Sequence, residues 1–444
     1  MPPSDRFRYD GFAIDPVGST VVCRYVTGAN AFTERFAFEH GGDWDHPAVL
    51  AAVRILYLLA GVSYYKTSAA PLIDLGQLPT TATERDFLHS FYVNGLGEFA
   101  YRNELDLRGL RVDGPDAGTV APVAFEPEPG LPLIPFGGGI DSIVTVASLV
   151  ADHPGAALCV VEPPGQRFAA IEDAAAVTGL PVTRIARTID PSVRRSAELG
   201  FLNGHVPVTA VISAAALVAA VLERRDAVVL SNEWSASVPT LVTDGVAVNH
   251  QWSKSETFER AFGDLVLSTF GPRLSVFSYL RPRTELWVAE QFAGLTQYHR
   301  TFRSCNRAFH QDPAQRLDHW CGRCDKCCFV DLILAPFMER RDLEAVFAGD
   351  EPLQNPANEE PLRTLLGLGH GVKPFECVGD IGECRAALVL TTQREDRAGS
   401  TLLARLRAEL GDAAPTDPSA LLRPRGTHRI PDRYAPPDLL VRAR

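Results

Sequence analysis

Residues 135–142 read Pro-Phe-Gly-Gly-Gly-Ile-Asp-Ser, so three successive glycines precede an acidic and a hydroxyl residue. Glycine lets the backbone approach a phosphate closely and adopt a positive φ. A helix that begins after the glycines would direct its free N–H groups and its positive dipole end at the anion. Ser142 could add a hydroxyl donor, and Asp141 could hold Mg²⁺ or cap the helix. The pattern predicts a phosphate-binding loop, and the triplet alone also fits a glycine-rich turn.

A second group with the potential for metal chemistry is a run of cysteines late in the chain. Its members are Cys305, Cys321, Cys324 and Cys327. One cysteine, a loop and two successive Cys-x-x-Cys steps can close a tetrahedral zinc site, which leaves no open position for a substrate. We therefore predict a structural zinc site. Free buried cysteines and a redox pair are the alternatives, and Cys328 is expected to be a spare thiol or a substitute for Cys305.

Polar residues follow the apolar run at 227–230. In an open parallel sheet the carboxyl ends of the strands line the ligand crevice. Asn232 and Glu233 are therefore predicted to face a bound nucleotide, with a plain loop as the alternative. A little further on, His250 and Lys254 lie in a stretch that also contains Trp252. This combination favours substrate contact, and both residues are candidates for acid–base chemistry.

Residues 370–379 are bounded by glycines and rich in titratable side chains. This segment is the best candidate for acid–base chemistry in the C-terminal third of the chain. His370 would titrate near neutral pH, Cys377 could act as a thiolate, and Lys373 could orient the carboxylates or the diphosphate of a substrate. The alternative is a turn that holds an ordinary buried cysteine.

The elements that must position these residues alternate between strands and helices after residue 130. This order predicts an α/β fold with a doubly wound parallel sheet. Earlier segments alternate apolar and polar residues, which is typical of half-buried strands, and a stretch rich in proline and glycine at 106–130 resembles a linker. We expect strands at 7–14, 20–26, 32–38, 131–135, 157–161, 182–185 and 227–230, and helices at 47–60, 84–101, 141–150, 168–178 and 207–222.

The length of 444 residues predicts more than one domain. We predict a β-rich and helical N-terminal domain over residues 1–128, a nucleotide-binding domain over 129–300, a zinc-binding segment over 301–340 and a mixed C-terminal region over 341–444.

The bulk composition excludes several classes of protein. The formal net charge of −11 does not favour non-specific binding of nucleic acid. The longest apolar stretch, residues 208–222, is too short to span a bilayer, and the N-terminus has no apolar signal core. We expect a cytoplasmic enzyme that acts on a small molecule, with no nucleic-acid or membrane partner and an oligomeric state that the sequence leaves open.

Residues 137–142 resemble the Ser-Gly-Gly-x-Asp-Ser signature of the PP-loop ATP pyrophosphatases, with Gly137 where that family has serine. The resemblance implies a HUP-like core that binds ATP and magnesium and breaks the bond between the α and β phosphates. It assigns ATP binding to Gly137, Gly138, Gly139, Asp141 and Ser142, with Asn232 and Glu233 nearby. The cysteine cluster downstream is similar to the structural zinc site of the 7-cyano-7-deazaguanine synthases.

Further segments resemble the UDP-N-acetylmuramoyl-L-alanyl-L-glutamate epimerases over nearly the whole chain. They are residues 60–66, 91–98, 135–142, 231–233, 249–255, 305–327 and 373–377. The resemblance implies ATP- and magnesium-dependent inversion of the terminal L-glutamate of the UDP-sugar dipeptide to D-glutamate. Adenylylation of the carboxylate would release pyrophosphate and then AMP, in the synthesis of peptidoglycan precursors.

The chemistry implied by the resemblance is self-consistent. Adenylylation removes the negative charge of the carboxylate, so a general base can take the α-proton and reprotonation on the other face inverts the centre. Two alternatives remain at this level. One is an amidating or thiolating enzyme that acts on a nucleobase or a transfer RNA, and the other is a zinc-stabilised binding module with an inactive loop.

Overall fold

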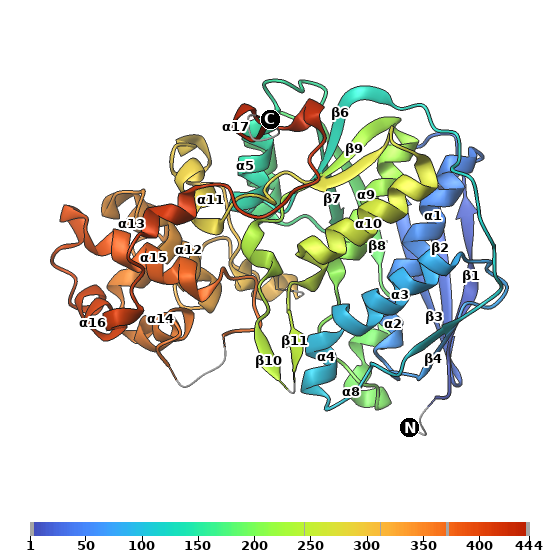
Figure 1. The fold of residues 1–444 in the computed structure, drawn as a ribbon, viewed down its shortest axis with the longest axis horizontal. Coiled ribbons are helices and arrows are strands. Elements are labelled where there is room, and N and C mark those ends of the chain that lie inside the picture. Colours follow the sequence, from blue (N-terminus) through green and yellow to red (C-terminus); the bar gives the residue numbers. More distant parts are fainter. Residues whose placement is uncertain (1–3, 244, 311, 370–372, 441–444) are drawn as a thin grey trace.

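A computed structural model describes residues 4–243, 245–310, 312–369 and 373–440. Its centre is a ten-stranded sheet in the order β12-β9-β6-β7-β8-β3-β2-β1-β4-β5 (Figure 1). Its first five strands in that order are all parallel, which confirms the predicted α/β class with a mostly parallel sheet. They are β6 (Glu128–Pro135), β7 (Ala157–Glu162), β8 (Val182–Thr188), β9 (Arg225–Leu230) and β12 (Ser275–Ser278).

The parallel strands are buried on both faces, because successive residues enter two different cores. Leu133 packs with the core on the side of α9, whereas its neighbour Ile134 packs with the core on the side of α5. Helices that cover both faces of a parallel sheet explain why these strands are continuously apolar. The covering helices are α5 (Ile140–Leu149), α6 (Ala169–Thr178), α9 (Val208–Leu222), α10 (Glu256–Phe270) and α11 (Glu285–Ala293), and the short helices α7 (Pro191–Arg194) and α8 (Ser196–Leu199) lead into α9.

The three N-terminal strands continue this same sheet. They are β1 (Phe7–Asp15), β2 (Thr20–Thr27) and β3 (Asn30–Phe38), as their alternating pattern predicted. They form an antiparallel meander, and β3 pairs with β8 through Arg35 opposite Thr188. β4 (Leu72–Asp74) and β5 (Arg111–Asp113) complete the far edge.

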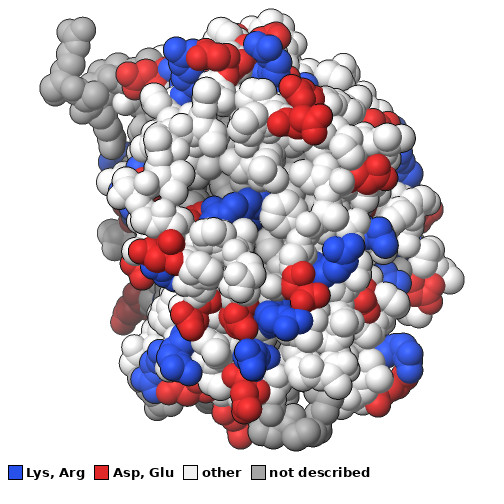
Figure 2. Space-filling view, turned by 90° about the vertical axis from the view of Figure 1, so that its right-hand side faces the viewer, with Lys and Arg blue, Asp and Glu red and all other residues white. Residues whose placement is uncertain are grey.

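Acidic and basic side chains are interspersed over the face of the molecule shown in Figure 2.

The stretch Pro47–Tyr65 is formed by α1 (Pro47–Ala60), which confirms the predicted helix, and by α2 (Val62–Tyr65). At 19 residues it is longer than the apolar stretch at 208–222, although Arg54 interrupts it. It is long and apolar enough to cross a membrane, but 83% of that window is buried inside the protein. The helix expected at 84–101 is divided into α3 (Ala82–Gly95) and α4 (Gly97–Arg102). Glu98, in α4, is buried inside the protein.

The C-terminal part is a separate group of helices beside the sheet (Figure 1). α15 packs against both α12 and α16. The tail then returns to the sheet, where the Tyr434 hydroxyl donates to Asp226 at the start of β9. The helices of the C-terminal part are α12 (Asp325–Leu334), α13 (Arg340–Val346), α14 (Glu359–Leu365), α15 (Ile381–Thr392), α16 (Thr401–Leu410) and α17 (Pro437–Leu440). A small antiparallel hairpin, β10 (Leu241–Thr243) with β11 (Val246–Val248), contacts α4.

The turn between β6 and α5 depends on Gly138. This residue has φ of +73°, and a Cβ added there would lie 2.1 Å from the carbonyl oxygen of Ala170 in α6. At Gly137 an added Cβ would meet no atom of the described residues within 4 Å. The glycine triplet is therefore required sterically at its second position and open at its first.

Gly138→Ala should lower the free energy of unfolding by about 2 kcal/mol or more, because left-handed strain and a clash with α6 add together. Gly137→Ala is the matched control and should change the stability by much less. Thermal or urea denaturation of the two variants measures the difference. Equal stability of both would contradict this account of the loop.

Candidate active site

The order of the parallel strands changes direction between β6 and β9. From β6 the chain runs outward through β7 and β8, and it then returns to β9 and β12 on the other side of β6. At such a point the loops that leave the two central strands diverge and open a crevice. The glycine loop follows β6, and the segment with Asn232 and Glu233 follows β9. The fold therefore brings together the two segments that the sequence predicted for ATP.

The glycine loop ends in an uncapped helix. Gly139 is the N-cap of α5, and within the described part of the chain no side chain caps its first turn, so Asp141 does not act as the cap. Ser142 donates its hydroxyl to the Gly139 carbonyl over 3.1 Å. A helix start without a side-chain partner leaves backbone N–H groups available to an anion. This arrangement fits the predicted phosphate loop.

Asp141 lies in a group of three acidic side chains. One oxygen each from Asp141, Glu233 and Glu285 can be chosen so that all lie within 4.8 Å of one another. Glu233 is 2% exposed and Glu285 is 4% exposed. The atoms Asp141 Oδ1 and Glu233 Oε1 are buried and have no hydrogen-bond partner among the residues that the structure describes. Oxygen ligands in this arrangement suit a hard divalent cation such as Mg²⁺.

The electrostatics of this acidic group support the same interpretation. Burial, followed by the negative charge of Glu233, raises the pKa of Asp141 to about 7. Burial and the charge of Asp141 also raise the pKa of Glu285. Like charges this close cannot all ionise unless a cation neutralises them. Glu285 was missed at the sequence level because it begins α11, where an acidic residue is an ordinary helix feature.

Arg281 holds the two site loops in place. It is 1% exposed. Its guanidinium donates to the Glu233 carbonyl over 2.7 Å, to the Lys254 carbonyl over 2.6 Å and to the Glu259 carboxylate over 2.7 Å. The backbone of Asn232 is fixed separately by the hydroxyl of Ser278 in β12. The acidic loop after β9 and the loop with Lys254 thus share one buried anchor.

A second cluster surrounds the thiol of Cys377. Lys254 Nζ lies 3.4 Å from Cys377 Sγ, and the His250 side chain is close enough to the thiol to lower its pKa. Nδ1 of His250 pairs with Glu98 Oε2 at 2.5 Å. Lys326, at the start of α12, donates to the Cys377 carbonyl. Three of the predicted site residues, His250, Lys254 and Cys377, therefore meet at one point.

The charges in this cluster stabilise a thiolate beside an imidazolium. Burial alone would raise the pKa of Cys377, but the charge of Lys254, the hydrogen bond from His250 and the charge of Lys326 lower it to about 6. Burial opposes protonation of His250, yet Cys377 and Glu98 raise its pKa to about 9. Between these values the sulfur is negative and the ring is positive. Such an ion pair makes a cysteine reactive near neutral pH.

The thiolate cluster and the acidic group belong to one site. The charges of Lys326 and Lys254 both act on Asp141 and oppose the rise in its pKa, and Cys377 acts on it as well. Lys254 in turn is held in its charged form by Cys377, Glu233 and Asp141, against its burial. The phosphate loop and the reactive thiol are therefore electrostatically coupled across a single polar interior.

The other predicted members of the 370–379 segment are placed differently. His370 lies outside the described residues. Lys373 is half-buried, and its charge acts on Cys384 in α15. Sequence reasoning did not single out Glu98 or Lys326 for the chemistry. Their signals were weak, because Glu98 follows a glycine at a helix start and Lys326 lies among the cysteines.

The four predicted zinc ligands converge. The sulfur atoms of Cys305, Cys321, Cys324 and Cys327 lie within 4.8 Å of one another. Cys327 Sγ is 3.6 Å from Cys321 Sγ and 3.4 Å from Cys324 Sγ. Sulfurs bound to one tetrahedral zinc at about 2.3 Å would lie about 3.8 Å apart. Cys328 is buried outside this set.

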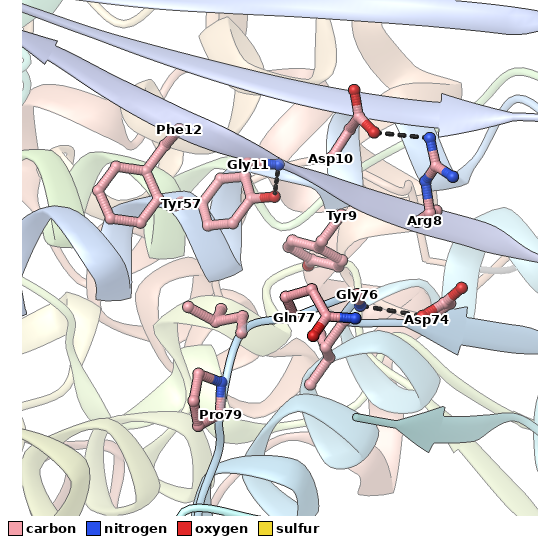
Figure 3. A pocket seen from close by; sticks show the side chains of 12 residues that line it. Arg8, Tyr9, Asp10, Gly11, Phe12, Tyr57, Asp74, Gly76, Gln77 and Pro79 are labelled. Carbon is pink, nitrogen blue, oxygen red and sulfur yellow. Dashed lines mark hydrogen bonds and ion pairs between the residues drawn. The ribbon is translucent and has the colours of Figure 1, made fainter. Parts of the chain in front are cut away.

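A cavity of about 620 Å³ lies elsewhere, between β1 and residues 74–79 (Figure 3). Its polar groups bind one another: Arg8 pairs with Asp10, and the Gly11 amide donates to the Tyr57 hydroxyl. None of its lining residues belongs to the charged clusters. We assign this cavity no part in the chemistry.

The Cys377 thiol should react with iodoacetamide half-maximally near pH 6, whereas an ordinary cysteine does so near pH 8.5. Lys254→Met removes the main cation and should move the midpoint upward. Cys384→Ala is the control, since that thiol is fully buried and should contribute no early reaction. Peptide mass spectrometry over a pH series gives the midpoint, and an unshifted profile in Lys254→Met would refute the assignment.

Comparisons with known proteins give a consistent result. A family model of the MurL N-terminal domain matches residues 2–279, and a model of the MurL C-terminal domain matches residues 301–420. No solved structure matches the chain significantly.

Three curated relatives carry the same name, UDP-N-acetyl-alpha-D-muramoyl-L-alanyl-L-glutamate epimerase. The relative from Xanthomonas oryzae pv. oryzae is 40% identical over 88% of this chain and 86% of its own length. The relative from Salinispora tropica is 38% identical over 86% and 82%, and that from Micromonospora sp. is 34% identical over 97% of each chain. The chain therefore belongs to the MurL family of UDP-N-acetyl-α-D-muramoyl-L-alanyl-L-glutamate epimerases.

Proposed function

We propose that this chain inverts the terminal L-glutamate of UDP-N-acetylmuramoyl-L-alanyl-L-glutamate to D-glutamate in the cytoplasm, as a step in peptidoglycan precursor synthesis. The reaction consumes ATP, adenylylates a glutamate carboxylate, and releases pyrophosphate and AMP. One observation carries the proposal: the acidic group at the glycine loop and the thiolate–imidazolium cluster share one buried site. The names of the relatives support the choice of substrate.

The glycine loop serves the first half of the reaction, in which ATP adenylylates the carboxylate. Backbone N–H groups at the start of α5, with the Ser142 hydroxyl, bind the phosphates of ATP. Mg²⁺, held by Asp141, Glu233 and Glu285, would neutralise phosphate charge when bound. Gly137 lacks the serine hydroxyl of the related signature. Its position is open enough that the backbone itself can contact a phosphate.

The second half belongs to the cluster of Glu98, His250, Lys254 and Cys377. An acyl adenylate carries no carboxylate charge, so its α-proton is acidic enough for a protein base. The cluster holds groups that can accept and return a proton, together with the ammonium of Lys254, which can stabilise the charge that develops on the carbonyl oxygen. Water then cleaves the activated acyl group and makes the inversion irreversible.

The four-cysteine cluster has a structural role in this proposal. A zinc ion held by Cys305, Cys321, Cys324 and Cys327 would fix the start of α12. Lys326 lies within that start and binds the Cys377 carbonyl. The cluster thereby positions the reactive thiol without contact to the substrate.

The competing functions predict different products. An amidating or thiolating enzyme should release AMP with ammonia or transfer RNA present, and a binding module should release none. We expect AMP release with the UDP-sugar dipeptide and not with the other two acceptors. Chromatography of the nucleotides after incubation with Mg²⁺-ATP separates these cases.

Asp141→Asn should lower AMP release by at least about 100-fold, because a ligand and a charge in the phosphate site are lost. The melting temperature should stay equal or rise, since the substitution removes repulsion within the acidic group. Asp152→Asn, an exposed carboxylate just beyond the end of α5, should retain full activity. Near wild-type turnover of Asp141→Asn would remove Asp141 from the mechanism.

Protein purified without chelators should contain one zinc ion per chain by elemental analysis. Cys324→Ser should lose the metal and unfold or aggregate, because a structural zinc site contributes directly to folding. Cys328→Ala removes a neighbouring thiol outside the cluster and should keep its zinc. A metal-free wild-type protein, or a soluble and active Cys324→Ser, would contradict this role.

A further inference from the structure

Glu98, His250 and Cys377 form a relay of carboxylate, imidazole and thiol. Glu98 occupies Nδ1 of the ring, which leaves Nε2 as the nitrogen available to the Cys377 thiol, whose charge acts on the ring. Glu98 is 5% exposed and comes from α4, whereas His250 precedes α10 and Cys377 precedes α15. Three segments that are far apart in the sequence thus meet at the Cys377 thiol. A base oriented by a carboxylate and aimed at a thiol is the arrangement of an acyl-transfer nucleophile.

We propose that Cys377 is the acyl carrier of this enzyme: its thiolate takes the glutamyl group from the adenylate as a thioester, and inversion occurs on that thioester. The inference rests on the proposed function, which supplies the acyl adenylate. It goes further by giving Cys377 a covalent role in place of a role in proton transfer.

The step balances without an outside oxidant or reductant. The sulfur lone pair forms a bond to the acyl carbon, and the bond from that carbon to the phosphate oxygen breaks, with its electron pair leaving on AMP. A base removes the α-proton of the thioester, and a proton returns to the other face. Water then attacks the acyl carbon, and the sulfur leaves with its electron pair as the thiolate.

Acylation of Cys377 removes a negative charge that helps to keep His250 protonated. The charge of Cys377 and its hydrogen bond are among the causes that raise the pKa of His250. A thioester sulfur carries no charge, so the imidazolium loses this support and can release its proton. The neutral ring then lies beside the newly acidified α-carbon and can act as the base. Formation of the thioester therefore frees the His250 ring to remove the α-proton in the next step.

Lys254 completes the arrangement. Its ammonium lies 3.4 Å from the sulfur. A cation at this position can stabilise the enolate oxygen of the thioester. A thiolate that served only as a proton acceptor would instead be paired with two cations that weaken it as a base.

The decisive experiment is a single-turnover rapid quench with enzyme in excess over the UDP-sugar dipeptide, Mg²⁺-ATP and deuterated water. Pyrophosphate, AMP and deuterium at the glutamate Cα are measured for the wild-type enzyme and Cys377→Ala. Cys384→Ala serves as the control, because that buried thiol lies in α15 and is not among the groups that set the pKa of Cys377. Thermal melting of both variants verifies that they are folded.

If Cys377 carries the acyl group, Cys377→Ala should form pyrophosphate at close to the wild-type rate. Its AMP release should fall by at least about 100-fold, since the nucleophile that displaces AMP is missing, and deuterium should be absent. Acid-quenched wild-type protein should show the peptide of Cys377 heavier by the mass of the dipeptide substrate less one water. The AMP rate of the variant decides the question even if the thioester is too short-lived to accumulate.

Normal AMP release by Cys377→Ala without deuterium would overturn the acyl-carrier role, assign Cys377 to proton transfer and leave the proposed function standing. A folded variant that forms no pyrophosphate would place Cys377 in adenylylation and would also overturn the inference. If the wild-type enzyme itself forms no pyrophosphate with the dipeptide, the proposed function fails, and this inference fails with it.

Discussion

This structure depends on one constraint: the charges buried at the carboxyl ends of the parallel strands must compensate one another. Three carboxylates, two lysines, a histidine and a thiol occupy one interior region. Any one of these charges would be costly to bury alone. Because these side chains come from segments that are far apart in the sequence, their charges can compensate one another only when those segments lie together in the fold. Arg281 reinforces this by binding the carbonyls of two site loops at once.

The cysteine cluster and the reactive thiol are linked through the start of α12. Lys326 lies between two cluster cysteines, and it binds the carbonyl of Cys377 and lowers the pKa of its thiol. A disturbance of the cluster would therefore change both the position and the ionisation of Cys377. This linkage explains how a closed four-cysteine site, which cannot bind substrate, could still be required for activity. It also places the C-terminal helical part in the chemistry, because Cys377 comes from that part of the chain.

Local patterns predicted the elements well, because strand and helix periodicity is a short-range signal. Residue type and spacing singled out the glycine loop, the four cysteines, Glu233, His250, Lys254 and Cys377, which the fold brings together in the candidate site and the cysteine cluster. What the sequence could not show were pairings between distant segments. The joining of β3 to β8 has no local signature, nor does the meeting of Glu98 with His250 across 152 positions. Glu285 was missed because it lies in the first turn of α11, where an acidic residue is an ordinary feature.

The central claim is that one buried site couples ATP cleavage to proton exchange at the glutamate α-carbon. The most direct test incubates the wild-type enzyme with UDP-N-acetylmuramoyl-L-alanyl-L-glutamate and Mg²⁺-ATP in deuterated water. The account predicts that D-glutamyl product forms only while AMP is released, and that this product carries one solvent deuterium at Cα. D-glutamyl product that forms without AMP, or that retains its original α-proton, would contradict it.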